Sequence, residues 1–262
     1  MNRVFSLSVA VLLIILVIIG CGKSVDERES KKTVLRIAGS TSMVPVSERL
    51  ARAYEKKHPG VRVHIEGGDS TLGIRGASGG IVDIGSVSRP LTREESKSLK
   101  SYKITEDSIS IIVNEKNPVK ALAINEIREV FSGTINNWSM VEGFNTPITL
   151  IGREHGSGTY RVFEDIVMSN TPVDGKTLVM TSTGAVLSTV ARDSNAIGYV
   201  SSNYHAEGVR KLEIHTGEDR AIALKRPLLY VIPENTSELA LDYINFCTGD
   251  EGRQIIAGYL EK

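Results

Sequence analysis

From Val34 onward, short apolar segments alternate with segments whose apolar residues recur at helical spacing. The first kind predicts strands and the second predicts amphipathic helices, so the chain is expected to be an α/β protein with mostly parallel sheets. The run at 108–113 is almost continuously apolar, as buried parallel strands are. The expected strands are residues 34–38, 61–65, 82–85, 108–113, 148–151, 178–180, 196–200 and 228–232. The first expected helix begins near residue 46 and ends before Pro59-Gly60. The other expected helices are residues 124–131, 159–168, 185–192, 237–247 and 249–259.

The N-terminus has the pattern of an export signal. Arg3 gives a positive start, and residues 4–19 form a mostly apolar run. As a helix this run is about 24 Å long, shorter than the roughly 30 Å hydrocarbon core of a bilayer. That length favours a secretory signal over a spanning helix, and an uncleaved membrane anchor is the alternative.

The run ends in Ile18-Ile19-Gly20-Cys21, which resembles the lipobox of bacterial lipoproteins, with Ile18 in place of the usual leucine. The resemblance implies that residues 1–20 are a signal peptide and that Cys21 becomes the acylated N-terminus, carrying an acyl chain such as palmitate. Residues 21–33 are mostly polar and charged, so they are expected to form a flexible tether. The rest of the chain would then be extracytoplasmic and anchored by lipid to the cell membrane.

Composition excludes several classes of function. With 31 basic and 31 acidic residues the chain has no net charge, so no global field attracts nucleic acid. Two cysteines, Cys21 and Cys247, are too few for a disulfide framework or a thiolate metal cluster. We therefore expect no metal and no cofactor, and we expect Cys247 to be a buried packing thiol in an amphipathic helix, without a catalytic role.

Three loops place hydroxyl groups or glycines between a strand and the start of a helix. Helix starts leave N–H groups unpaired and carry partial positive charge, so such loops can converge on an anion. Each loop alone is better explained by N-capping, but three of them, one beside an arginine, favour an anion site. The loops are Gly39-Ser40-Thr41-Ser42, Gly67-Gly68-Asp69-Ser70-Thr71-Leu72-Gly73 and Arg153-Glu154-His155-Gly156-Ser157-Gly158-Thr159.

The enzyme motifs that these loops suggest are incomplete. Gly156-x-Gly158-x-x-Arg161 lacks the third glycine of a dinucleotide fingerprint, and no P-loop sequence occurs. Gly68-Asp69-Ser70 is similar to the nucleophile block of one class of esterases, but no Asp-x-x-His sequence occurs to supply a base. An exported serine hydrolase is therefore the weaker alternative to a binding protein.

From Val34 to the C-terminus the chain resembles the phosphate-binding proteins of bacterial phosphate ABC transporters. The motifs are AGSTSMVPV, GGDSTLGIRG, VDIGSVSRP, REHGSGTYRVF, AIGYVSSNY and the closing PLLYVIPE and YINFCTGDEG. The resemblance implies a two-lobe periplasmic-binding-protein fold of type II topology, with a mostly parallel sheet in each lobe and the ligand in the cleft. Lobe 1 would be residues 34–112 plus 203–262 and lobe 2 residues 113–202, with crossovers near 111–114 and 198–202.

The same resemblance implies the ligand-binding residues. One of them departs from the pattern of the better-studied members: Ser88 occupies the position of a carboxylate that accepts the proton on phosphate. Asp69 and Glu154 are the nearest alternative acceptors in sequence, and Asp83 is a poorer candidate that we expect to pair structurally. The implied phosphate ligands are Thr41, Ser42 through its backbone N–H, Ser70, Ser88, Arg153, Ser157, Gly158 and Thr159.

The expected function is that of a monomeric receptor that binds inorganic phosphate between its lobes and delivers it to the permease subunits of an ABC importer. An arginine fork with neutral donors suits an oxyanion and still permits its release. Another tetrahedral oxyanion, namely sulfate, molybdate or tungstate, is the alternative ligand, because related binding proteins share the lobes.

Overall fold

The computed structural model describes residues 32–216 and 220–260. The predicted signal peptide, Cys21 and residues 22–31 of the predicted tether lie outside these ranges. No helix within the described ranges is both long enough and apolar enough to cross a bilayer.

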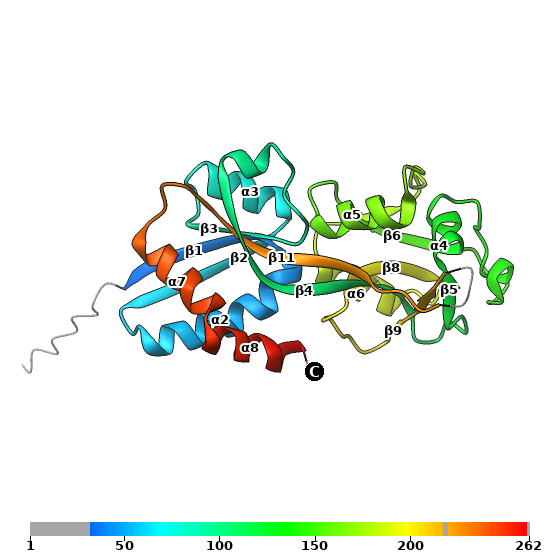
Figure 1. Cartoon of the computed structure of the whole chain (residues 1–262). Coiled ribbons are helices and arrows are strands. Elements are labelled where there is room, and N and C mark those ends of the chain that lie inside the picture. The colour runs from blue at the N-terminus through cyan, green and yellow to red at the C-terminus, as the bar shows by residue number, and fades with distance from the viewer. Residues whose placement is uncertain (1–31, 217–219, 261–262) are drawn as a thin grey trace, which may run out of the picture. The chain divides into compact units, whose positions relative to one another are not determined.

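Strands and helices alternate along the described chain, as the sequence predicts (Figure 1). The α/β class is therefore confirmed. The strands are β1 (Thr33–Ser40), β2 (Val61–Gly68), β3 (Ile84–Val87), β4 (Leu99–Asn114), β5 (Ala121–Ala123), β6 (Thr149–Arg153), β7 (Leu178–Met180), β8 (Ala196–Ser201), β9 (Val209–Lys211), β10 (Glu213–His215) and β11 (Leu224–Pro233). The helices are α2 (Val44–Lys57), α3 (Ser70–Ser78), α4 (Ile124–Phe131), α5 (Gly158–Phe163), α6 (Thr183–Arg192), α7 (Glu238–Thr248) and α8 (Asp250–Leu260).

Most strands belong to one nine-stranded sheet, in the order β2-β1-β3-β11-β4-β8-β6-β7 with β9 paired to β4. At one end of this order β1 is parallel to β2 and β3, and at the other end β6 is parallel to β7 and β8. The two strands in the middle, β11 and β4, are antiparallel to each other and to their outer neighbours β3 and β8. Two parallel groups are thus joined by one antiparallel pair.

Each parallel group has its own hydrophobic core. Lobe one comprises β1–β3 with α2, α3, α7 and α8, and in its core the Tyr54 ring contacts Tyr243 edge-on with centroids 5.0 Å apart. Lobe two comprises β5–β8 with α4–α6, and in its core the rings of Phe163 and Tyr199 stack 4.0 Å apart. The fold therefore consists of two separately packed lobes.

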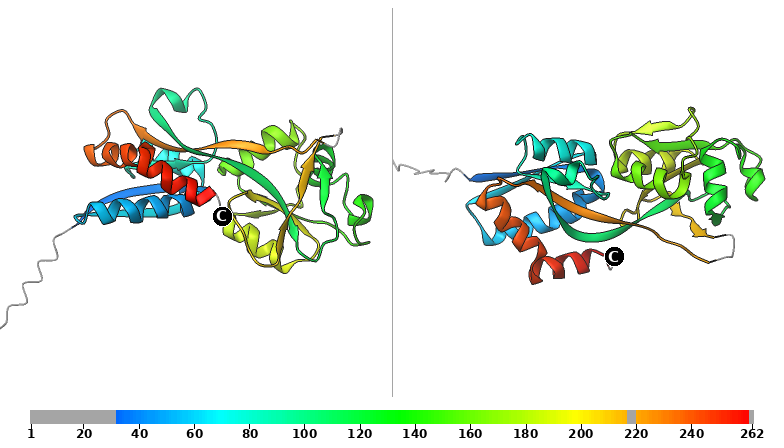
Figure 2. Two further views of the ribbon diagram at one scale, coloured as in Figure 1. Left: turned by 60° about the horizontal axis from the view of Figure 1, so that its bottom comes forward. Right: turned by 45° about the horizontal axis from the view of Figure 1, so that its top comes forward.

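The long strands β4 and β11 connect the lobes. Ile104 and Leu228 belong to the core of lobe one, whereas Ile111 and Leu224, on the same two strands, belong to the core of lobe two. Figure 2 shows these strands running together from one lobe to the other. Side chains on this pair can therefore contact loops from both lobes.

Two expectations for the crossover region are wrong. The strand predicted at 108–113 is part of β4 and pairs antiparallel with β11 and β8. Its apolar residues are buried because both faces are covered, with Ile111 and Ile112 in different hydrophobic clusters, and this burial needs no parallel neighbours. The return crossover was expected near 198–202, but that segment forms β8 inside lobe two, and β11 is the strand that returns.

Some residues that the expected boundaries assign to lobe one pack in lobe two. Leu212 and Ile214, which the expected boundaries assign to lobe one, lie in the core of lobe two. The boundaries themselves stay a prediction.

Cys247 in α7 is fully buried, and burial raises the pKa of its thiol to about 12. Its prediction as a buried packing thiol is confirmed. A thiol that stays protonated at neutral pH is a poor nucleophile.

Candidate functional site

The first hydroxyl-bearing loop lies where β1 ends and the chain turns into α2. At Gly39 the backbone φ is +137°, and a Cβ atom there would lie 2.2 Å from the carbonyl oxygen of Ser86, so only glycine fits. The next residues, Thr41–Met43, form one turn of 3-10 helix ahead of α2. This tight turn places the hydroxyls of Ser40, Thr41 and Ser42 at the carboxyl end of β1.

Two further serines join this loop from neighbouring elements of lobe one. Ser70 opens α3 and Ser88 follows β3, and both are fully buried. Ser40 Oγ donates to Ser88 Oγ at 2.8 Å, and the Ser88 N–H donates to Ser70 Oγ at 3.0 Å. Parallel strands bring their carboxyl ends to one edge of a sheet, which is why residues far apart in sequence meet here.

Lobe two contributes the arginine. Arg153 ends β6 and is 4% exposed. Its Nε and Nη2 donate to the two carboxylate oxygens of Glu154 at 2.8 and 2.7 Å, and its Nη1 donates to Thr183 Oγ1 at 3.4 Å. Glu154 therefore fixes one edge of the guanidinium, and the Nη1–Nη2 edge keeps N–H groups that can bind an oxyanion.

The turn after Arg153 packs closely against lobe one. Ser157 caps α5 by accepting the Tyr160 N–H at 3.3 Å. At Gly158 a Cβ atom would lie 2.4 Å from Ser70 Oγ and 2.5 Å from Ser88 Oγ. Glycine thus lets the backbone of lobe two approach the buried serines of lobe one.

Hydrogen bonds between the lobes complete the arrangement. Thr183 N–H donates to Thr41 Oγ1 at 3.2 Å, and Ser42 Oγ lies 3.1 Å from Thr159 Oγ1. All eight predicted ligands are near one another, and Ser40 and Thr183 join them. We call this set the interlobe cluster: Ser40, Thr41, Ser42, Ser70, Ser88, Arg153, Ser157, Gly158, Thr159 and Thr183.

A buried ion pair on the crossing strands contacts the interlobe cluster. Arg226 of β11 and Asp107 of β4 have side chains that are 0% exposed, and Arg226 Nη2 lies 2.8 Å from Asp107 Oδ2. Arg226 also donates to Thr159 Oγ1 at 2.7 Å and to Ser42 Oγ at 3.1 Å. Burial lowers the pKa of the Arg226 guanidinium, and the charge of Asp107 opposes that shift.

Sequence reasoning missed four of these residues. Ser40 lies in the first predicted loop, and Thr183 lies between a strand and a helix, in the same setting as the three loops that were identified. The criterion already includes Ser40, although the resemblance does not name it as a ligand, and Thr183 could have been found by applying the criterion again. Asp107 and Arg226 are 119 residues apart, and no local pattern pairs them.

The carboxylates considered as acceptors for a phosphate proton already have partners. Glu154 binds Arg153 with both oxygens. Asp69 caps α3 by accepting the Leu72 N–H at 2.7 Å. Asp83 accepts the Arg36 N–H at 2.7 Å, which agrees with the expected structural role.

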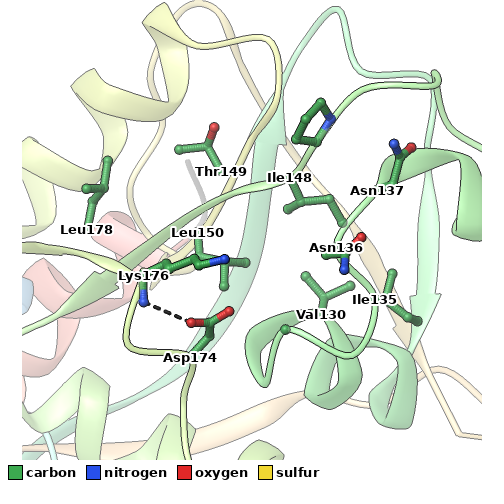
Figure 3. Close-up of a pocket in the computed structure, with 12 residues that line it drawn as sticks. Val130, Ile135, Asn136, Asn137, Ile148, Thr149, Leu150, Asp174, Lys176 and Leu178 are labelled. Carbon is green, nitrogen blue, oxygen red and sulfur yellow. Dashed lines mark hydrogen bonds between the residues drawn. The ribbon is translucent and has the colours of Figure 1, made fainter.

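Figure 3 shows a pocket in lobe two, and none of the residues that line it belongs to the interlobe cluster. Val130, Ile148 and Leu150 line it, together with Asp174, which accepts the Lys176 N–H at 2.9 Å. Asn136, Asn137 and Lys176 also line it, but none of the predicted phosphate ligands does. Within the described ranges no group of His, Cys, Asp and Glu residues is arranged to hold a metal ion.

A family model described as a PBP superfamily domain matches residues 26–251. The chain belongs to the PBP superfamily. It is similar to a phosphate ABC transporter substrate-binding protein from Clostridium perfringens, solved with bound phosphate. The two are 32% identical with a TM-score of 0.80, over 87% of this chain and 98% of that one. A phosphate transport receptor from Vibrio cholerae is 28% identical, with a TM-score of 0.68 over 86% and 98% of the two chains.

Curated relatives point to the same family. The phosphate-binding protein PstS of Staphylococcus epidermidis is 26% identical over 92% of this chain and 81% of its own length. The phosphate-binding protein PstS 2 of Streptococcus agalactiae is 41% identical over 104 residues, which span 39% of this chain and only 36% of that protein. The resemblance drawn from the sequence motifs and the periplasmic-binding-protein fold are thereby confirmed.

Proposed function

We propose that this chain is an extracytoplasmic receptor that binds inorganic phosphate in the interlobe cluster and delivers it to the membrane subunits of an ABC importer. One observation carries the proposal: buried hydroxyl groups from both lobes and the Nη1–Nη2 edge of Arg153 lie together in the interlobe cluster. The names of the relatives support phosphate as the ligand. The two-lobe receptor is proposed to act as a monomer and to have no catalytic activity.

The donor set explains how such a site would hold a dehydrated anion. The free edge of Arg153 supplies the charge, because Glu154 orients the guanidinium and leaves its Nη1–Nη2 edge available. The remaining groups are neutral hydroxyls and N–H groups, which replace water at the anion's oxygens. Hydrogen bonds to a charged group are stronger than those between neutral groups, so these donors stabilise the bound anion. Because only one arginine adds a full charge, the anion can still be released.

Calorimetry on the dialysed chain beginning at Thr33 tests the ligand. We expect phosphate to bind with a stoichiometry of one and with higher affinity than sulfate, molybdate or tungstate. Tighter binding of one of the other anions would replace phosphate as the ligand. Hydrolysis of an ester probe that is lost in Ser70→Ala would instead support the hydrolase alternative.

A lipid attached to Cys21 is proposed to anchor the protein to the membrane. Expression with the native leader is expected to place the protein in the membrane fraction and to label it with palmitate. Cys21→Ser should abolish the label, because that thiol is the proposed acylation site. Cys247→Ser is the matched control and should keep it, since Cys247 is buried. Label that persists in Cys21→Ser would reject the proposal.

Discrimination between phosphate and sulfate is proposed to be weak, because Ser88 replaces a carboxylate. A carboxylate accepts the proton of phosphate and repels sulfate, whereas a hydroxyl can accept or donate. We expect excess sulfate to compete with phosphate in the wild type near neutral pH, and we expect competition to disappear in Ser88→Asp.

Asp69→Asn serves as the control, because Asp69 is the carboxylate of the same loop and directly precedes Ser70. It should behave as wild type, and circular dichroism should verify that Ser88→Asp folds. Strong exclusion of sulfate by wild type, unchanged in both variants, would show that neither residue discriminates.

A further inference from the structure

The Asp107–Arg226 ion pair on the crossing strands is hydrogen-bonded to residues of both lobes. Arg226 donates from Nε and Nη2 to Asp107 Oδ2 at 3.1 and 2.8 Å. Its Nη1 reaches Thr159 Oγ1 of lobe two and the Ser88 carbonyl of lobe one at 2.7 and 3.4 Å, and its Nη2 reaches Ser42 Oγ of lobe one at 3.1 Å. Every N–H group of the guanidinium thus has a partner in the protein.

These contacts fix the direction of two hydroxyl groups. A guanidinium can only donate, so the oxygens of Ser42 and Thr159 must accept from Arg226. The two hydroxyls are also 3.1 Å apart, so one of them can donate to the other. Whichever does so, the other hydroxyl keeps its hydrogen for a further acceptor.

We propose that Arg226 is a positioning residue that holds the Ser42 and Thr159 hydroxyls so that one of the two donates a hydrogen bond to the bound oxyanion. This inference rests on the proposed function. Without Arg226 the two hydroxyls are free to rotate and to present a lone pair to the anion, which is repulsive. The role is orientation and not charge, because the pair with Asp107 has no net charge.

Asp107 is in turn held from its other side. Its Oδ1 accepts from Ser202 Oγ at 3.0 Å and from Asn203 Nδ2 at 3.1 Å, while Oδ2 accepts from Arg226. With both oxygens engaged, Asp107 keeps the guanidinium in one orientation. Because the charges of Asp107 and Arg226 cancel, both residues can be replaced together without changing the net charge of the protein.

The test is calorimetry of phosphate binding to Asp107→Asn/Arg226→Met, which keeps the net charge of the wild type. We expect affinity to fall by about 10–150-fold, the size of losing one hydrogen bond to a charged group. The matched control is Arg89→Met/Glu95→Gln, a partly buried bidentate pair whose side chains contact neither Ser42 nor Thr159. It should bind as wild type.

A double-mutant cycle separates orientation from a general structural effect. In the background Ser42→Ala/Thr159→Val, the two hydroxyls through which Arg226 acts are absent. Adding Asp107→Asn/Arg226→Met there should weaken binding by less than about threefold, because residues that act through one another are not additive. A loss that is fully additive would overturn the inference, as would wild-type affinity in the pair variant.

A second variant keeps the test decisive if the pair variant does not fold. Arg226→Lys retains the charge beside Asp107 but has no planar fork to reach both hydroxyls, so its affinity should also fall. Wild-type affinity in Arg226→Lys would overturn the inference. Failure of wild type itself to bind phosphate would overturn the proposed function and this inference together, whereas binding that is unaffected by these variants overturns the inference alone.

Discussion

Arg153→Ala is expected to weaken phosphate binding by about 10–150-fold or more, measured by calorimetry. Arg153 supplies the only full positive charge with a free donor edge that the resemblance places on the anion. The substitution also leaves the Glu154 carboxylate without its partner beside the site, where its charge would repel the ligand. Both effects act in the same direction, so this should be the costliest single loss among the proposed ligands.

Two companion variants separate these effects. Arg153→Ala/Glu154→Gln removes the arginine without leaving the carboxylate, and should recover part of the lost affinity. Arg161→Ala, an exposed arginine of α5 paired with Glu164 and Asp165, is the matched control and should bind as wild type. Ser157→Ala and Thr41→Val should each cost less than Arg153→Ala. Wild-type affinity in Arg153→Ala would reject the assignment of the site.

The sequence predicted most elements because their signals are local. The helix at 124–131 and the strand at 178–180 have the predicted bounds, and α2 ends where Pro59 follows. Periodicity reports how a segment is buried, however, and not what it pairs with. The run at 108–113 is covered on both faces within lobe two, with Ile111 in one hydrophobic cluster and Ile112 in another, and an apolar run of that kind looks the same in a parallel sheet.

The candidate site shows the same limit. Ser70, Ser88 and Thr159 could be named because each lies in a short motif that the resemblance covers. Asp107 lies in β4 and Arg226 in β11, in sequences with no motif, and the antiparallel register of these two strands places them opposite each other. Register between distant strands is a tertiary property, so only the structure brings these two residues together.

Arg226→Met alone is expected to lower the free energy of unfolding by about 3–5 kcal/mol, because it leaves the Asp107 carboxylate buried without its partner. Asp107 and Arg226 have 0% exposed side chains, so water cannot replace the lost contact without opening the region between the lobes. Removing both charges avoids that cost, since a buried pair can often be replaced by neutral residues with little loss. Asp107→Asn/Arg226→Met should therefore be markedly more stable than Arg226→Met.

Urea unfolding in phosphate-free buffer measures this difference without the contribution of ligand binding. Arg89→Met is the matched control: its partner Glu95 is 21% exposed, so solvent can reach the remaining carboxylate and the loss should be smaller. The m-values must agree among the proteins, because lobes that unfold separately would break the two-state comparison. A double variant as unstable as Arg226→Met would show that the packing of the guanidinium, and not the unpaired charge, carries the stability of this region.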